Sequence, residues 1–284
     1  MAKAISKTKQ GGEVMVASDF EQYAGQGTEN ITARDMKLPI LKLLSSNSPV
    51  LNPQDAKYNE DAKVGDIYNE VTGSIYRGKE GMLAVPCLYV NTFNEWADRG
   101  DSPGRPINIH TDSDILNKTH RGDDGRDRLP NGNYVEDTGN HFVYILNEEY
   151  VPIESALITM KSTQKKKSKL WNAQMASKRV QGTKGFFNPP SWATVYRLTT
   201  VQESNNKGNW PGWAIEFDRF LEPTKSAVDA EVCQITKDFY LSAREFDIFN
   251  KVDFVEAEEA GSAKKNTQSP PPQPEAKEED KVVF

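Results

Sequence analysis

The sequence predicts a mainly β fold of the α+β class, in which a partly open antiparallel barrel carries two packed helices. Segments rich in β-branched and aromatic residues recur over residues 64–220, whereas helical periodicity is confined to a few short segments. Only 37% of the 284 residues are hydrophobic, which leaves much of the chain to loops and tails. We therefore expect one domain at 31–252, between a flexible N-terminal segment, 1–30, and a disordered acidic tail, 253–284.

The strongest strand prediction in the N-terminal half is the segment 82–96, whose sequence is MLAVPCLYVNTFNEW. Pro86 within it indicates a sheet edge or a β-bulge, because proline has no backbone N–H to donate. The other segments expected as strands are 64–72, 141–146, 156–162, 192–202 and 213–220.

Two helices are expected to pack on this sheet. In the first, at about 165–180, Trp171 and Met175 fall on one face. The second, at about 226–250, carries an apolar stripe with steps of four, three and four, made by Val228, Val232, Ile235 and Phe239.

A further helix is expected where the domain begins. It would start either near Thr32, whose hydroxyl can cap it, or at Pro39, since proline suits a first helical turn. The apolar residues that would anchor it in the core are Ile40, Leu41, Leu43 and Leu44.

Residues 98–140 are rich in Gly, Asp and Arg and are expected to form a long polar excursion between strands. Its carboxylates are Asp112, Asp114, Asp123, Asp124, Asp127, Glu136 and Asp137. Their order does not follow the EF-hand pattern, basic residues are mixed among them, and no histidine has a metal-site spacing with a cysteine. We therefore expect a solvated loop, with no metal and no cofactor.

Charge is unevenly distributed along the chain. The net charge is −6, yet residues 155–202 contain no acidic residue. The basic residues of this segment are Lys161, Lys165, Lys166, Lys167, Lys169, Lys178, Arg179, Lys184 and Arg197. Such cations displace the counterions condensed on a nucleic-acid backbone, which favours phosphate contacts.

Aromatic residues are interleaved with these cations, namely Trp171, Phe186, Phe187, Trp192 and Tyr196. Unstacked bases bind flat aromatic faces, so the combination predicts a surface for single-stranded nucleic acid. The alternative is a solvated basic helix beside ordinary core aromatics. Trp171 is the aromatic residue most expected in the core, and adjacent Phe186 and Phe187 would point opposite ways in a strand.

The last residues of the chain combine acidic side chains with an aromatic end. Glu278, Glu279, Asp280 and Phe284 are expected to bind a basic-rimmed pocket of a partner protein, or to compete with DNA for the cationic surface. The alternative is a tail that only adds solubility.

Several classes of protein are excluded or disfavoured. No stretch approaches the roughly 20 apolar residues of a membrane span, and the N-terminal residues lack the apolar region of a secretory signal. Two cysteines, Cys87 and Cys233, do not make a disulfide scaffold. The motifs GxxxxGK[ST], GxSxG and HExxH are absent, so we expect a cytoplasmic protein that is not an enzyme.

Five pieces of the sequence, in this order, resemble a family of bacteriophage proteins described as single-stranded-DNA-binding proteins. They are SNSPV, GDIYNEVTG, LPNGNYVED, MKSTQKKKSKLWNAQM and VYRLTTVQESNNKGNWPGW. The resemblance covers about 31–249 and is strongest over 155–213. The ending EEDKVVF is similar to tails of phage and bacterial single-stranded-DNA-binding proteins that recruit replication enzymes, although Lys277 and Lys281 depart from that pattern.

Together these observations predict an OB-like barrel that binds single-stranded DNA without sequence specificity and protects it during phage replication or recombination in the host cytoplasm. Replication or recombination proteins would bind the tail, and no membrane is involved. Two alternatives are a virion or assembly protein that contacts DNA and a metal-dependent nuclease or recombination enzyme built on the excursion. The oligomeric state stays open, with a homodimer as one alternative.

Overall fold

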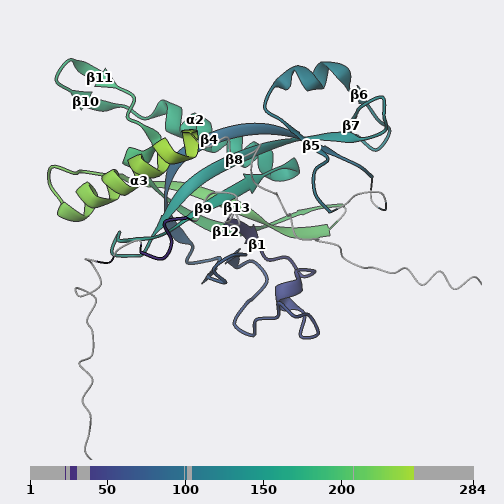
Figure 1. Ribbon diagram of the computed structural model, residues 1–284, viewed down its shortest axis with the longest axis horizontal. Coiled ribbons are helices and arrows are strands. Elements are labelled where there is room, and N and C mark those ends of the chain that lie inside the picture. Colours follow the sequence, from purple (N-terminus) through teal and green to yellow (C-terminus); the bar gives the residue numbers. More distant parts are fainter. Residues whose placement is uncertain are drawn as a thin grey trace, which may run out of the picture.

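One strongly curved sheet of eleven strands dominates the computed structural model, which describes residues 23, 26–30, 39–98, 100, 104–206 and 208–245 (Figure 1). Its main path runs β13 (Gly208–Phe220), β12 (Thr194–Asn205), β4 (Met82–Trp96), β8 (Tyr134–Leu146), β9 (Pro152–Met160), β1 (Ile40–Leu43), β2 (Ile67–Asn69) and β3 (Ile75–Tyr76). All neighbours on this path are antiparallel except β1 and β9, which are parallel. The predicted mainly β, partly open barrel is confirmed.

Strand β4 has the predicted bounds, and its first six residues, Met82–Cys87, are all buried. Alternate side chains enter different cores, because Met82 and Ala84 pack in one cluster while Leu83, Val85 and Cys87 pack in another. The pairing of β4 with β8 shifts register between Pro86 and Leu88, which confirms the bulge. Such bulges bend a strand and help the sheet curl.

Helix α2 (Lys165–Ser177) covers one face of the sheet and helix α3 (Ala227–Glu245) covers the other. Trp171 of α2 packs among the side chains of Ala84, Val143 and Leu198. Val232 of α3 packs against the opposite face. Both helices were predicted, and both lie close to β4 and β8 in Figure 1.

The prediction of a helix that begins at Pro39 is wrong. Ile40–Leu43 form strand β1, which pairs with β2 on one side and β9 on the other. Pairing on both sides satisfies the backbone groups of this short apolar segment within the sheet, so helix formation is not needed to bury it. The alternative start at Thr32 lies outside the described residues.

The excursion at 98–140 is not a plain loop. It contains β5 (Asn108–His110), η4 (Ser113–Lys118), β6 (His120–Arg121), β7 (Asp127–Arg128) and the polar first half of β8. These strands extend the sheet around a small apolar cluster of their own, made by Phe93, Leu129 and Val135. Most of their other side chains are polar, which hides the strand pattern in the sequence. They lie at the opposite end of the longest axis from the hairpin of β10 (Val180–Gly182) and β11 (Gly185–Phe187) (Figure 1).

Short 3-10 turns complete the fold, namely η3 (Pro49–Leu51), η5 (Ser162–Gln164) and η6 (Ser191–Ala193). Within the described ranges, no helix is both long and apolar enough to cross a membrane. The segment 253–284, and all of 1–30 except residues 23 and 26–30, lie outside the described residues.

Candidate nucleic-acid interface

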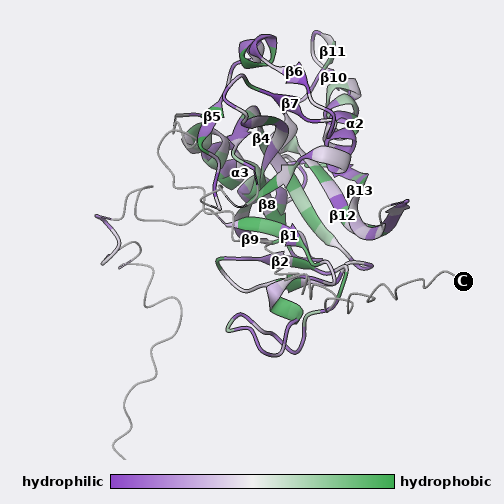
Figure 2. Ribbon diagram, turned by 90° about the vertical axis from the view of Figure 1, so that its right-hand side faces the viewer, coloured by the Kyte–Doolittle hydropathy of each residue, from purple (hydrophilic) through white to green (hydrophobic). Residues whose placement is uncertain are grey.

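Helix α2 presents a polar outer side, coloured largely as hydrophilic in Figure 2. Lys166 and Lys169 are exposed on it, whereas Ser168 and Trp171 are buried beneath. Three lysines open the helix with no acidic residue in its first turn, although cations there oppose the helix dipole. This arrangement costs helix stability unless the lysine charges are compensated by acids from elsewhere in the fold.

Helix α2 lies very close to β8 at Gly139. A Cβ atom on residue 139 would lie 2.4 Å from Ser168 Oγ, so only glycine permits this approach. The approach places Ser168 Oγ 2.8 Å from His141 Nε2. Trp171 then stacks on the His141 ring, with centroids 4.4 Å apart and an interplanar angle of 22°.

Two of the aromatic residues predicted to stack on bases are fully buried. Trp171 and Tyr196 have no exposed surface, and their rings pack edge to face. Both belong to the core between α2 and the sheet, as expected for Trp171, so neither side chain lies where it could contact a base. Trp192 is partly buried and packs against the core beneath α3.

Several of the predicted phosphate contacts are already paired with acids. Carboxylates from other strands and loops bind the cations in the pairs Lys161–Glu136 (3.4 Å), Lys165–Asp137 (2.6 Å), Lys167–Glu203 (3.1 Å) and Arg197–Glu148 (2.7 Å). Lys165 is also buried and bonds to Asn91, so its prediction as a phosphate contact is wrong. Residues 155–202 contain no acidic residue, but the fold places acidic residues from other parts of the chain beside their cations.

The remaining cations fall into two groups. Lys178 Nζ lies 3.4 Å from the centre of the Phe217 ring, and Arg179 donates to the carbonyls of Ala176 and Lys178 at the end of α2. The side chains of Lys166, Lys169 and Lys184 make no hydrogen bond or ion pair to any residue that the structure describes. They are the cations most available to an anionic ligand.

The β10–β11 hairpin carries the two aromatic residues of the predicted base-stacking set that are exposed. Phe186 is 75% exposed and Phe187 is 49% exposed. The Phe187 ring packs against Gly182 of the paired strand β10. A Cβ atom on residue 182 would lie 3.0 Å from this ring. The Asn188 side-chain amide donates to the carbonyls of Met175 and Lys178, which fastens the hairpin to the end of α2.

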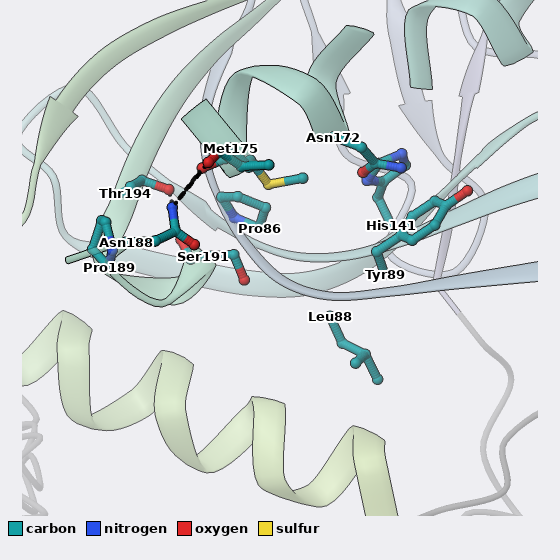
Figure 3. A pocket seen from close by; sticks show the side chains of 11 residues that line it. Pro86, Leu88, Tyr89, His141, Asn172, Met175, Asn188, Pro189, Ser191 and Thr194 are labelled. Atoms are coloured by element: carbon teal, nitrogen blue, oxygen red, sulfur yellow. Dashed lines mark hydrogen bonds between the residues drawn. The ribbon is translucent and has the colours of Figure 1, made fainter. Parts of the chain in front are cut away.

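A pocket of about 220 Å³ lies between α2, β4 and the residues that follow the hairpin (Figure 3). It is lined by Pro86, Leu88, Tyr89, His141, Asn172, Met175, Ala176, Asn188, Pro189, Ser191 and Thr194. Burial, and then the nearby charge of Lys165, lower the pKa of His141 to about 3, so its ring is neutral at physiological pH. No motif in the sequence indicated this pocket, because its walls come from four separate segments.

The model of a phage protein family, the Pam3 phage gp34-like protein, matches residues 8–247 of the chain. The chain belongs to this family. No curated protein and no solved structure matches it. The predicted resemblance to phage proteins is therefore confirmed, while single-stranded-DNA binding stays a prediction for this gp34-like protein.

Three carboxylates in the excursion of this gp34-like protein, Asp98, Asp124 and Asp127, are bound by arginines. Arg128 bonds to both Asp98 and Asp124, and these hydrogen bonds lower the pKa of each carboxyl. Across the described ranges, no group of three or more His, Cys, Asp or Glu side chains is placed to hold a metal ion. The tail residues Glu278, Glu279, Asp280 and Phe284 lie outside the described residues.

Proposed function

We propose that this phage protein binds single-stranded DNA on the outer side of α2 and on the β10–β11 hairpin. The observation that carries the proposal is the exposure of Phe186 and Phe187 beside Lys184, a cation without an acidic partner in the described structure. Leaving a phenylalanine in water forgoes about 1.5–3 kcal/mol of burial free energy, which a stacked base would recover.

The arrangement favours a single strand over a duplex. Lysines contact phosphates in either form, but stacking on a phenylalanine needs a base that is free of its partner. Neither kind of contact distinguishes one base from another, so this surface would have little sequence preference. The proposed role is to protect single-stranded DNA in phage replication or recombination, without catalysis.

The proposal extends to partner proteins. Replication or recombination proteins would bind the acidic segment that holds Glu278, Glu279, Asp280 and Phe284. Negative side chains and an aromatic ring suit a basic-rimmed apolar pocket. Deleting residues 275–284 should abolish partner capture, and it should tighten DNA binding at low salt if the segment also competes with DNA.

Binding to a labelled single strand of roughly 30 nucleotides and to the matching duplex, over roughly 50–300 mM salt with and without Mg²⁺, tests the proposal. We expect tight, salt-sensitive preference for the single strand, which stays intact. Phe186→Ala should weaken that binding about tenfold, since one stacked base contributes about 1–3 kcal/mol.

Ile153→Ala is the matched control, because Ile153 is an exposed apolar residue on β9. It should leave the affinity unchanged. Equal binding to both forms of DNA, or an unaffected Phe186→Ala variant, would contradict the proposal and favour a virion or assembly role. Mg²⁺-dependent degradation would favour a nuclease.

A further inference from the structure

The β10–β11 hairpin projects beyond the end of α2 (Figure 1). Among the described strands, β10 and β11 pair only with each other. Their ladder begins with Val180 opposite Phe187, shortly after α2 ends at Ser177. The orientation of the hairpin, and of the exposed Phe186, relative to α2 is therefore not fixed by pairing with the described main sheet.

One side chain joins the base of the hairpin to the helix. The amide nitrogen of Asn188, the residue after β11, lies 3.1 Å from the carbonyl oxygen of Met175, 3.4 Å from that of Ala176 and 2.9 Å from that of Lys178. The last carbonyl groups of an α-helix have no partner within the helix, so they accept such donors readily. Asn188 thus closes the end of α2 and ties the hairpin to it with the same group.

The neighbours of Asn188 make this tie decisive for the orientation of the hairpin. The Phe187 ring packs against Gly182 within the hairpin, which stabilises the hairpin but does not orient it on α2. Pro189 and Pro190 follow Asn188, and their fixed φ limits motion after it. On this side a swing of the hairpin must occur at Asn188 or before it, where the three hydrogen bonds oppose it.

The proposed DNA surface has two parts that this tie connects. Lys166 and Lys169 are exposed on α2, whereas Lys184 and Phe186 are exposed on the hairpin. A strand that has met one part meets the other at an effective concentration that depends on how closely the two are held. A hairpin that swings freely must be ordered when DNA binds, and this ordering weakens the affinity.

We infer that Asn188 is a positioning residue for DNA binding, which holds Phe186 and Lys184 beside the end of α2 so that one strand contacts hairpin and helix together. Asn188 acts through Phe186 and not by its own contact with the strand. The inference rests on the proposed function and adds to it a residue that keeps the two parts of the surface in place.

A double-mutant cycle on a labelled single strand of roughly 30 nucleotides tests the inference. Asn188→Ala should weaken binding about fivefold, as expected if the untied hairpin is correctly placed about a fifth of the time. The loss should not exceed the roughly tenfold loss expected for Phe186→Ala, which removes the stacked base altogether. The double variant should bind within about twofold of Phe186→Ala alone, because an untied hairpin has no stacking left to lose.

Hydrogen exchange shows whether the substitution acts where the inference places it. The backbone amides of β10 and β11 should exchange faster in Asn188→Ala, while those of β4 and β8 keep their rates. Asn147→Ala is the matched control, because the Asn147 side chain accepts from the backbone N–H groups of Glu149 and Val151 in the turn between β8 and β9. That variant should keep both the DNA affinity and the exchange rates of the hairpin.

The outcomes separate the inference from the function on which it rests. Absence of single-strand binding by the unmodified protein, or full affinity of Phe186→Ala, would overturn both. Full affinity of Asn188→Ala beside a weakened Phe186→Ala would overturn the inference and leave the proposed function standing. Losses that multiply in the double variant would also overturn the inference, since Asn188 would then act independently of Phe186.

Discussion

The salt dependence of DNA binding should distinguish the cations that meet phosphates from those that the fold has already paired. Lys166, Lys169, Lys178, Arg179 and Lys184 have no carboxylate partner in the described structure. Each phosphate contact to a single strand contributes about −0.7 to the slope of log K against log salt, so these five predict a slope of about −3.5. Changing Lys166, Lys169 and Lys184 together to Gln should flatten it by about 2.

A control variant can carry the same change in net charge. Lys161, Lys167 and Arg197 are bound to Glu136, Glu203 and Glu148, and their replacement by Gln removes an equal number of positive charges. We expect this second triple variant to change the slope by less than about 0.7, the contribution of one phosphate contact.

Fluorescence anisotropy of a labelled single strand, titrated at several salt concentrations, measures both slopes. Melting temperatures should accompany the titrations, because loss of surface ion pairs costs about 0–1 kcal/mol each and the variants should remain folded. Equal flattening by the two triple variants would refute the reasoning, since the paired cations would then reach phosphates as readily as the unpaired ones.

Three further predictions concern stability. Burial by itself would raise the pKa of Glu95, but hydrogen bonds from three asparagines and His110 outweigh it and lower the pKa to about 2. The lowering from 4.5 corresponds to about 3 kcal/mol. Glu95→Gln should therefore lose about that much unfolding free energy in urea at pH 7, and the difference should shrink as the pH falls below about 4.5 toward 2; a constant difference would contradict this account. Trp171→Ala should lower the unfolding free energy by about 3–5 kcal/mol. The milder Trp171→Phe should keep the DNA affinity, because a core residue does not contact DNA; loss of binding in a folded Trp171→Phe variant would contradict the core position. Gly139→Ala should lower the melting temperature because its Cβ would collide with Ser168 Oγ, so an unchanged melting temperature would argue against the close approach of α2.

Sequence patterns predicted the elements whose burial is regular. Strand β4 is apolar along its first buried stretch, Met82–Cys87, and α2 carries Trp171 and Met175 on its inward side, so both could be located. The first half of β8 reads as a loop because its strand residues are polar. There Thr138 and Asn140 are buried in hydrogen bonds to side chains of β4, which a linear pattern does not reveal.

The candidate site was predictable in its location but not in its chemistry. The exposure of Phe186 follows from a hairpin that pairs only with itself among the described strands, whereas Tyr196 lies on β12, which is paired on both sides at this residue, and is buried beneath α2. Neither position can be deduced from the spacing of aromatic residues. The acids that neutralise Lys165 and Lys167 lie on β8 and β12, far along the chain, so a count of local charge overstated the positive potential.

The parallel pairing of β1 with β9 has a consequence for the order in which the protein folds. Ile40 pairs with Leu157, so this contact brings together two residues that are far apart in the sequence and closes the whole segment between them into one loop. During synthesis from the N-terminus, the edge of β1 that pairs with β9 stays unpaired until β9 has been synthesised. Strands β2 and β3 follow β1 on the sheet path, so their final anchoring waits as well. The N-terminal edge of the sheet is thus expected to assemble late, around a framework built from β4, β8 and β9.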